Sequence, residues 1–385
     1  MDNEEIKMDR KIKVMSVFGT RPEAIKMCPL IARMQQEKTI ENVICVTGQH
    51  RFMLDQVLHI FGIRPDYDLA IMQENQTLTD ITTGILTGME NILQKETPDL
   101  ILVHGDTTTS FAAALAAFYG QIPVGHVEAG LRTDNRYSPF PEEMNRQMVA
   151  RLAELHFAAT ESNRENLLKE GVKNNIFVTG NTVIDAMKMT VKETYRFQEE
   201  ILNSIDFRNH KVILLTAHRR ENIDTPIHRI CAAAKRLTEV YQDVQVIYPV
   251  HLNPAVRKTV FAMLDRQERI ILTEPMNVED VHNLLARCYL VMTDSGGLQE
   301  EAAALGKPVV VLRRETERTE SINMGAAVLG GNTEQEIFRV VSSLLCEKEQ
   351  YQKMSWAKNP YGDGHACERI VSAILDWAEK KEGKA

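Results

Sequence analysis

Three carboxylates in the first half of the chain each come just after a short apolar run or a proline-rich loop. Asp106 comes after Leu100–Val103. Glu128 comes after Ile122–Val127, and Glu142 follows a proline-rich loop. If these runs are strands of one parallel sheet, the residues past their carboxyl ends line a common ligand crevice. Acids gathered at such an edge favour proton-transfer chemistry over a solvated rim.

Each of these acids also has a structural explanation that must be weighed. Asp106 precedes three threonines and could simply cap the next helix. Glu142 would begin a helix, where it could be a surface residue. Glu128 is harder to dismiss, because it sits in an apolar setting where an unpaired charge is costly. Two histidines, His104 and His126, flank the acidic turns and could orient them.

The motif Ser295-Gly296-Gly297 follows the strand-like run Leu290–Thr293 and opens a helical stretch. Glycines let the backbone approach a ligand closely, and a helix N-terminus offers N–H groups to an anion. A diphosphate would fit there. Glu301, about one turn into the helix, could accept hydrogen bonds from both ribose hydroxyls. The alternative is an ordinary capping turn.

Two further groups of cationic residues follow predicted strands. His218 and Arg219 come after an apolar run in the second half of the chain, and donors at that position suit phosphate. Arg21 and Lys26 come after the first predicted strand. The alternatives are a solvated basic turn for the first pair and an exposed helix charge for Lys26.

The elements that must position these residues are apolar runs that alternate with helical stretches along the whole chain. The predicted strands are 12–18, 43–47, 100–103, 122–127, 155–159, 176–179, 212–216, 244–248, 270–273, 290–293 and 308–312. Val, Ile and Leu dominate them without strict alternation, which is typical of parallel strands buried on both faces. The sequence therefore predicts an α/β fold with a doubly wound parallel sheet in each half. Asp66–Asp68 is interpreted as a turn.

A length of 385 residues exceeds what one core supports, so we expect two domains. We place them at 1–183 and 184–365. The polar stretch 188–210 is interpreted as a surface helix and connector. The amphipathic C-terminal segment 366–385 is expected to be a helix that packs back on the first domain.

Composition excludes several function classes. The net charge of −8, from 45 basic and 53 acidic residues, disfavours a general nucleic-acid or membrane-surface role. The six cysteines are far apart and form no C-x-x-C pair, so we expect neither a zinc site nor a disulfide framework but reduced thiols in a cytoplasmic protein. No apolar run approaches the length of a membrane helix. No G-x-G-x-x-G follows a strand, and we expect no cofactor and no metal.

Five motifs occur together in a fixed order, and their combination resembles one enzyme family. They are Gly19–Glu23, His104–Thr107, Gly125–Arg132, His218–Asn222 and Asp294–Gly297. The chain resembles the non-hydrolysing UDP-N-acetylglucosamine 2-epimerase family from about Lys11 to Trp377. The resemblance implies two Rossmann-like domains of the glycosyltransferase-B type, with the active site in an interdomain cleft, and a homodimer.

The resemblance also implies roles for individual residues. The implied catalytic residues are Asp106, Glu128, Glu142 and His218. The implied UDP contacts are Arg21, Lys26, His218, Ser295, Gly296, Gly297, Glu301 and Arg318. Some relatives are activated by substrate at a second site, and the matching positions here are Gln49, Gln76, Arg219 and His251.

The implied reaction interconverts UDP-GlcNAc and UDP-ManNAc, which feeds cell-surface polysaccharide synthesis. UDP leaves carbon 1, a proton leaves carbon 2, and the resulting 2-acetamidoglucal takes UDP back after protonation on its other face. Two faces require two proton-transfer groups, which accounts for more than one acid. The residues do not say which acid serves which face. The alternatives are a hydrolysing 2-epimerase that releases ManNAc, a glycosyltransferase of the same architecture, and a catalytically silent nucleotide-sugar sensor.

Overall fold

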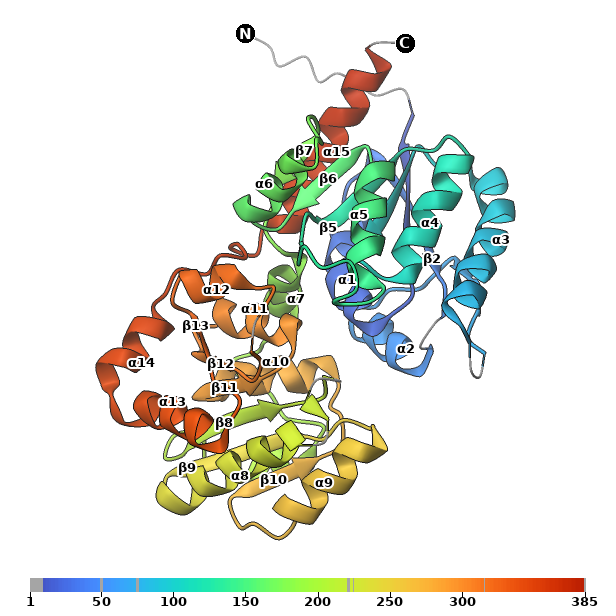
Figure 1. Ribbon diagram of the computed structural model, residues 1–385. Helices are drawn as coiled ribbons and strands as arrows, with labels where there is room; N and C mark the ends of the chain where they lie inside the picture. Colours follow the sequence, from blue (N-terminus) through green and yellow to red (C-terminus); the bar gives the residue numbers. More distant parts are fainter. Residues whose placement is uncertain are drawn as a thin grey trace. The chain divides into compact units, whose positions relative to one another are not determined.

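The chain forms two compact units, and it passes between them twice. The computed structural model describes residues 10–48, 51–73, 76–219, 222–223, 225–314 and 316–383. The first unit comprises Met1–Ala186 and Gly362–Ala385, and the second comprises Met187–Tyr361. Each unit is built around its own parallel β-sheet (Figure 1).

The first unit has a seven-stranded parallel sheet in the order β3-β2-β1-β4-β5-β6-β7. Its strands are β1 (Ile12–Phe18), β2 (Ile40–Val46), β3 (Tyr67–Asp68), β4 (Leu100–His104), β5 (Val124–Ala129), β6 (Leu155–Ala158) and β7 (Ile176–Val178). The strand order reverses between β1 and β4, which is where ligands bind in open α/β sheets.

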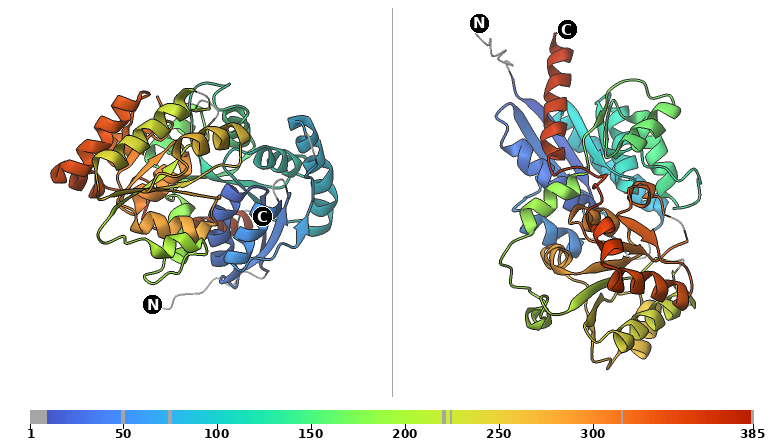
Figure 2. Two further views of the ribbon diagram at one scale, coloured as in Figure 1. Left: turned by 90° about the horizontal axis from the view of Figure 1, so that it is seen from below. Right: turned by 90° about the vertical axis from the view of Figure 1, so that its left-hand side faces the viewer.

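Helices cover both faces of this sheet. They are α1 (Arg21–Gln35), α2 (Arg51–Ile60), α3 (Leu78–Glu96), α4 (Thr108–Tyr119), α5 (Glu142–Leu152), α6 (Glu161–Lys169) and α15 (Ala366–Glu382). A further helix, α7 (Thr182–Thr190), begins in the first unit and ends in the second. Although α15 is the last element of the chain, it packs against α1 in the first unit (Figures 1 and 2). Its residues Ile370, Ile374 and Trp377 join Leu30 and Ile31 of α1 in one buried cluster.

The second unit has a six-stranded parallel sheet in the order β10-β9-β8-β11-β12-β13. Its strands are β8 (Lys211–Thr216), β9 (Val244–Pro249), β10 (Ile270–Thr273), β11 (Leu290–Thr293), β12 (Val309–Val311) and β13 (Ala327–Leu329). Its helices are η1 (Glu200–Ser204, a 3-10 helix), α8 (Thr225–Val240), α9 (Pro254–Leu264), α10 (Val278–Arg287), α11 (Gly296–Ala304), α12 (Thr319–Asn323), α13 (Glu334–Cys346) and α14 (Lys348–Ser355). The order reverses between β8 and β11. The predicted fold class, a doubly wound parallel sheet in each half, is confirmed.

Two local predictions were wrong. Tyr67–Asp68, predicted as a turn, is strand β3 at the edge of the first sheet, where the Asp66 carboxylate accepts the Ile44 backbone N–H at 2.8 Å. The polar stretch 188–210 is not one helix, because α7 ends at Thr190 and only the short η1 follows. In both segments, hydrogen bonds between side chains and backbone groups far apart in the sequence outweigh the local preference for a turn or a helix.

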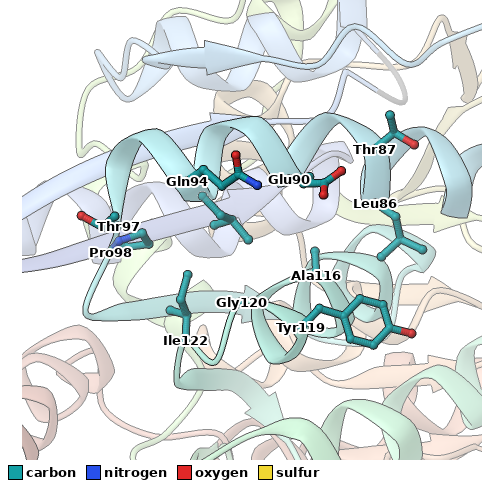
Figure 3. Close-up of a pocket in the computed structure, with 11 residues that line it drawn as sticks. Leu86, Thr87, Glu90, Gln94, Thr97, Pro98, Ala116, Tyr119, Gly120 and Ile122 are labelled. Atoms are coloured by element: carbon teal, nitrogen blue, oxygen red, sulfur yellow. The ribbon is translucent and has the colours of Figure 1, made fainter.

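A groove lies between α3 and α4 of the first unit (Figure 3). The residues that line it are Leu86, Thr87, Glu90, Leu93, Gln94, Thr97, Pro98, Ala116, Tyr119, Gly120 and Ile122. None of the predicted site residues is among them, so the groove is separate from the chemistry described below. Among the described residues, no helix is long and apolar enough to cross a membrane.

Candidate functional site

In both sheets, predicted site residues directly follow the two strands between which the strand order reverses. In the first unit, Arg21 follows β1 and Asp106 follows β4. In the second unit, His218 follows β8 and Ser295 follows β11. The carboxyl ends of these strands form the crevice in which α/β proteins bind ligands. Each unit therefore has one edge to which the predicted residues converge.

Two hydrogen-bond donors hold the Glu128 carboxylate near the carboxyl ends of the strands of the first sheet. It lies within β5, at an irregularity in the pairing with β6, and its backbone has a φ of +61°. Lys26 Nζ donates to Glu128 Oε2, and Asn181 Nδ2 donates to the same oxygen at 3.0 Å. The Glu128 side chain is 14% exposed and that of Lys26 is 9% exposed. The apolar neighbours in sequence suggested an unpaired charge, but Lys26, 102 positions away, pairs with it.

Two neutral histidines support this edge. His104 Nε2 lies 3.7 Å from Glu128 Oε2, and burial lowers the pKa of His104 to about 4. Within the described part of the chain, that nitrogen has no hydrogen-bond partner. Burial lowers the pKa of His126 to about 3, so its neutral ring donates from Nε2 to the Gly105 carbonyl at 2.7 Å. His126 thereby supports the turn that carries Asp106.

Arg146 pairs with the Asp106 carboxylate and contacts the backbone of Glu142. Its Nη2 lies 3.0 Å from Asp106 Oδ2, and its Nε donates to the Glu142 carbonyl at 3.3 Å. Asp106 is not the helix cap, because Thr107 fills that role for α4 by accepting the Ser110 N–H at 3.0 Å. Because Asp106 does not cap α4, its carboxylate can pair with the buried guanidinium of Arg146 at the carboxyl ends of the strands.

Glu142 and Glu143 are adjacent at the start of α5, but the structure separates them. Glu143 is fully buried and accepts the Thr133 N–H at 3.0 Å and the Gln147 amide at 2.8 Å. Glu142 Oε2 is also buried, and no described residue donates to it. Glu143 thus supports the preceding loop, whereas Glu142 keeps an oxygen without a protein donor among the described residues.

The turn after β1 is organised by Glu23. Its carboxylate accepts the backbone N–H groups of Gly19 and Thr20 and a hydrogen bond from the Thr107 hydroxyl. Burial raises the pKa of Glu23, although these hydrogen bonds oppose the shift. A Cβ on Gly19 would lie 2.0 Å from Thr47 Oγ1, so only glycine fits where β1 meets α1. Arg21 stands in the first turn of α1.

In the second unit, Asp294 connects the two loops that follow β8 and β11. It is fully buried, and its Oδ2 accepts the backbone N–H groups of His218 and Arg219 and the Asn222 amide, each at 2.8 Å. Its Oδ1 lies 3.3 Å from His218 Nδ1. Burial lowers the pKa of His218, and the Asp294 charge opposes that shift. Asp294 therefore fixes the backbone of His218 and places a carboxylate oxygen close to its ring.

Arg318 lies against the start of α11. A Cβ on Gly296 would lie 2.8 Å from Arg318 Cζ, so the glycine leaves room for the guanidinium. Arg318 Nε donates to Glu300 Oε1 at 3.0 Å and Nη1 donates to Glu317 Oε1 at 2.6 Å. Although burial opposes it, the charges of Arg318 and Arg313 lower the pKa of Glu317 to about 2. A cation and a helix N-terminus at one place favour a bound anion.

Glu301 lies one turn further along α11, where His282 Nε2 is 3.7 Å from its Oε2. His282 Nδ1 in turn bonds the Thr190 hydroxyl at 2.7 Å. Glu301 is 9% exposed, so its side chain is buried near the helix start. The ribose contact of Glu301 stays a prediction.

Two of the four residues at the suggested second site are close to His218. The His251 ring stacks on the His218 ring with centroids 5.3 Å apart, and Arg219 Nη2 lies 3.7 Å from Glu317 Oε1. Gln76 belongs to the first unit, where its amide donates to the Ile71 carbonyl. Gln49 lies outside the described residues, as do Arg220 and Glu221 of the predicted basic motif.

Sequence reasoning did not assign the residues that hold the predicted ones in place. They are Asn181 on Glu128, Arg146 on Asp106, Asp294 on His218, and Glu300 and Glu317 on Arg318. Asp294 belongs to the Asp294–Gly297 motif, and a charge directly after an apolar run was a signal for its role. Among the described residues, no cluster of three His, Cys, Asp or Glu side chains could hold a metal ion.

The chain is similar to known proteins along almost its whole length. A protein-family model described as UDP-N-acetylglucosamine 2-epimerase matches residues 32–375. The UDP-N-acetylglucosamine 2-epimerase of Bacillus subtilis is 52% identical over 367 residues, which cover 95% of this chain and 96% of that protein.

Two solved structures are similar along nearly their whole length. The crystal structure of UDP-GlcNAc 2-epimerase from Neisseria meningitidis bound to UDP-GlcNAc is 46% identical with a TM-score of 0.90, over 95% of this chain and 100% of that chain. The S. aureus MnaA–UDP structure is 48% identical with a TM-score of 0.88, over 96% and 97% of the two chains. The chain belongs to the UDP-N-acetylglucosamine 2-epimerase family.

Proposed function

We propose that this chain interconverts UDP-GlcNAc and UDP-ManNAc without hydrolysis. The observation that supports this most directly is the similarity to a 2-epimerase structure with UDP-GlcNAc bound, at 46% identity over 95% of this chain. The residues implied for that reaction stand at the carboxyl edges of the two sheets described above. No cofactor enters the reaction, because the leaving group itself supplies the driving force for proton loss.

In this proposal the second unit holds UDP. The N–H groups at the start of α11 and the guanidinium of Arg318 bind the diphosphate, and Glu301 accepts hydrogen bonds from the ribose hydroxyls. His218, fixed by Asp294, donates to the phosphate oxygens. Donors arranged before the bond breaks stabilise the negative charge that develops on the departing UDP.

The first unit supplies the proton-transfer groups. One carboxylate takes the proton from carbon 2 while the carbon 1–oxygen bond breaks and its electron pair leaves with UDP. A double bond then joins carbons 1 and 2. A second group protonates carbon 2 from the opposite face, and the UDP oxygen adds back to carbon 1. Asp106, Glu128 and Glu142 are the groups proposed for these two transfers.

The test is incubation with UDP-GlcNAc in deuterium oxide, followed by NMR. We expect UDP-ManNAc and UDP-GlcNAc that both carry deuterium at carbon 2. Free ManNAc as the main product would instead identify a hydrolysing 2-epimerase. Recovery of unlabelled UDP-GlcNAc alone would remove the epimerase proposal and favour a nucleotide-sugar sensor or a glycosyltransferase that lacks its acceptor.

Two further properties of the family are proposed for this chain. The first is a homodimer, which sedimentation velocity would detect as twice the mass of the chain. The second is activation by UDP-GlcNAc through Gln49, Gln76, Arg219 and His251. Initial rates from UDP-ManNAc should then rise when UDP-GlcNAc is added, and rates that stay constant would end this part of the proposal.

A further inference from the structure

Asn181 is a buried residue whose side-chain oxygen and nitrogen both form hydrogen bonds. It stands at the start of α7, and its Oδ1 accepts the Val183 backbone N–H at 3.0 Å. Asn181 is only 3% exposed to solvent. Because the oxygen faces a backbone donor, the amide nitrogen must point the other way. It points at Glu128, to which it donates at 3.0 Å.

This orientation favours the ionised form of the Glu128 carboxylate. An N–H group donates to a carboxylate oxygen, and a charge-assisted hydrogen bond of this kind is stronger than a neutral one. Lys26 Nζ donates to the same Glu128 oxygen. The two donors come from different elements, α1 and the β7–α7 turn, and they meet on one atom.

Glu128 needs such support because its backbone is unusual. A φ of +61° is uncommon for a residue with a side chain, and β5 is irregular at this point. An irregularity of this kind re-aims a side chain relative to the strand. A strained backbone conformation persists when the surrounding contacts hold it in place. The hydrogen bond from Asn181 to Glu128 is one of these contacts.

Asn181 is itself anchored where the chain passes between the units. Arg369 of α15 donates to the Thr179 carbonyl at 3.0 Å. A Cβ on Gly362 would lie 3.1 Å from Gly180 Cα, so the two crossing segments are in close backbone contact. The amide of Asn181 therefore projects from a packed turn and not from a free loop.

We propose that Asn181 is a positioning residue for the epimerase reaction, which holds Glu128 ionised and aimed for proton transfer at carbon 2. This inference rests on the proposed function and on the part that Glu128 has in it. Asn181 has no contact with UDP in this scheme. Its removal should affect the proton-transfer steps and leave substrate binding unchanged.

Two substitutions separate this role from a purely structural one. Asn181→Asp keeps an oxygen for the Val183 N–H but places a second carboxylate against Glu128. Asn181→Ser keeps a helix-capping oxygen but is too short to reach Glu128. We expect kcat to fall by about 100-fold in Asn181→Asp and by about 10-fold in Asn181→Ser, because positioned acid–base groups contribute roughly 10²–10⁴-fold. KM and the Kd for UDP should stay within about twofold.

The pH profile is the readout that a structural role would not move. A like charge beside Glu128 disfavours its ionised form, so the acidic limb of kcat/KM should move to higher pH in Asn181→Asp. Asn181→Ser should lower kcat with a smaller displacement of that limb. The matched control is Asn277→Asp, because Asn277 caps α10 by accepting the Asp280 N–H at 2.8 Å. This variant should keep the wild-type profile.

The outcomes distinguish the two proposals. If the wild-type enzyme exchanges deuterium at carbon 2 and both Asn181 variants match it in kcat and pH profile, only the role of Asn181 is wrong. If the variants lose UDP affinity in step with kcat, Asn181 has a structural role and the inference also fails. If Asn181→Asp does not fold, Asn181→Ser decides alone. If the wild-type enzyme shows no exchange, the proposed function fails first and this inference fails with it.

Discussion

Asp294 Oδ1 lies 3.3 Å from His218 Nδ1, while the other oxygen of the same carboxylate accepts the His218 backbone N–H at 2.8 Å. One buried acid thus fixes the backbone of a histidine that follows a different strand and lies close to the ring of that histidine. The pair joins the carboxyl ends of β8 and β11, where the strand order of the second sheet reverses.

Replacement of this acid by its amide should change both stability and titration. In Asp294→Asn we expect the free energy of unfolding to fall by about 1–3 kcal/mol, because three hydrogen bonds to a buried carboxylate lose their charge assistance. The pKa of His218 should fall further, because the Asp294 charge raises it in the native protein. Chemical denaturation and an NMR titration of the His218 ring measure the two effects.

Asp280 provides the matched control for that variant. It is also a buried acid of the second unit, and it accepts hydrogen bonds from the Tyr195 hydroxyl and from the Gln198 and Glu199 N–H groups. Asp280→Asn should destabilise the protein to a similar degree without moving the His218 titration. If the His218 titration is unchanged in Asp294→Asn, the charge of Asp294 does not influence the His218 ring, and this prediction is wrong.

Gly296→Ala should weaken UDP binding through Arg318. The new Cβ would lie 2.8 Å from Arg318 Cζ and displace the guanidinium from the start of α11. Loss of one charge-assisted hydrogen bond is worth about 1.5–3 kcal/mol, or roughly 10- to 100-fold in Kd. Isothermal titration calorimetry with UDP measures this change.

Gly84→Ala is the control for a glycine substitution within a helix. A Cβ there would lie 3.5 Å from Ile71 Cγ2, an ordinary contact, in α3 of the first unit. This variant should bind UDP as the wild type does. Its stability should rise by about 0.4–1 kcal/mol, because alanine reduces the entropy of the unfolded chain. Equal UDP affinities for Gly296→Ala and Gly84→Ala would argue against the role given to Arg318.

The three predicted acids should each be required for exchange at carbon 2. We expect Asp106→Asn, Glu128→Gln and Glu142→Gln each to lower the rate of deuterium incorporation by at least about 100-fold. UDP affinity should change little. NMR of the recovered nucleotide sugar gives the exchange rate, and Glu154→Gln is the control, because Glu154 instead accepts the Trp377 indole N–H at 2.8 Å. Retained exchange in one variant would remove that acid from the catalytic set.

The first unit should lose stability in mild acid before the second does. Burial lowers the pKa of His104 to about 4, of His126 to about 3 and of His156 to about 4, against about 6.5 in an unfolded chain. The unfolded chain therefore binds these protons first, and stability falls as the pH drops from 6.5 toward 4. Each histidine accounts for a loss of roughly 3 kcal/mol by pH 4.

In the second unit the pKa of a carboxylate is also lowered, so its stabilising effect is lost at a lower pH than that of the first-unit histidines. The pKa of Glu317 is lowered to about 2, so its stabilising effect is complete above about pH 4.5 and is lost between 4.5 and 2. The chain has two tryptophans, Trp377 in the first unit and Trp356 in the second. Urea unfolding of Trp356→Phe and Trp377→Phe variants at several pH values reports each unit separately. A first-unit midpoint that is constant between pH 6.5 and 4 would refute this prediction.

Much of the architecture could be predicted from local pattern. Runs of Val, Ile and Leu such as Leu100–Val103 and Leu290–Thr293 are strands in the structure, because burial on both faces of a parallel sheet demands continuous apolar residues. The short edge strand β3 could not be predicted from such a pattern. Tyr67–Asp68 is paired with β2 only because Asp66 and neighbouring backbone groups bond to a strand more than 20 positions away.

The positions of the predicted site residues followed from the same logic, but their partners did not. Arg21, Asp106, His218 and Ser295 stand past strand ends, where a sequence pattern can place them. That Lys26 pairs with Glu128 could not be predicted, because the two are 102 positions apart. Long side chains choose partners in three dimensions, and sequence spacing carries no information about that choice.

The sequence by itself determined the two-sheet plan, the edges that carry chemistry and the family resemblance, since these depend on local periodicity and on ordered motifs. Only the tertiary structure decided which charges are paired and which groups are neutral. It sets Asn181 and Lys26 on Glu128, Arg146 on Asp106, and Asp294 beneath His218. The physical reason is that burial and Coulomb interactions act through space and depend on residues that the chain brings together only when it folds.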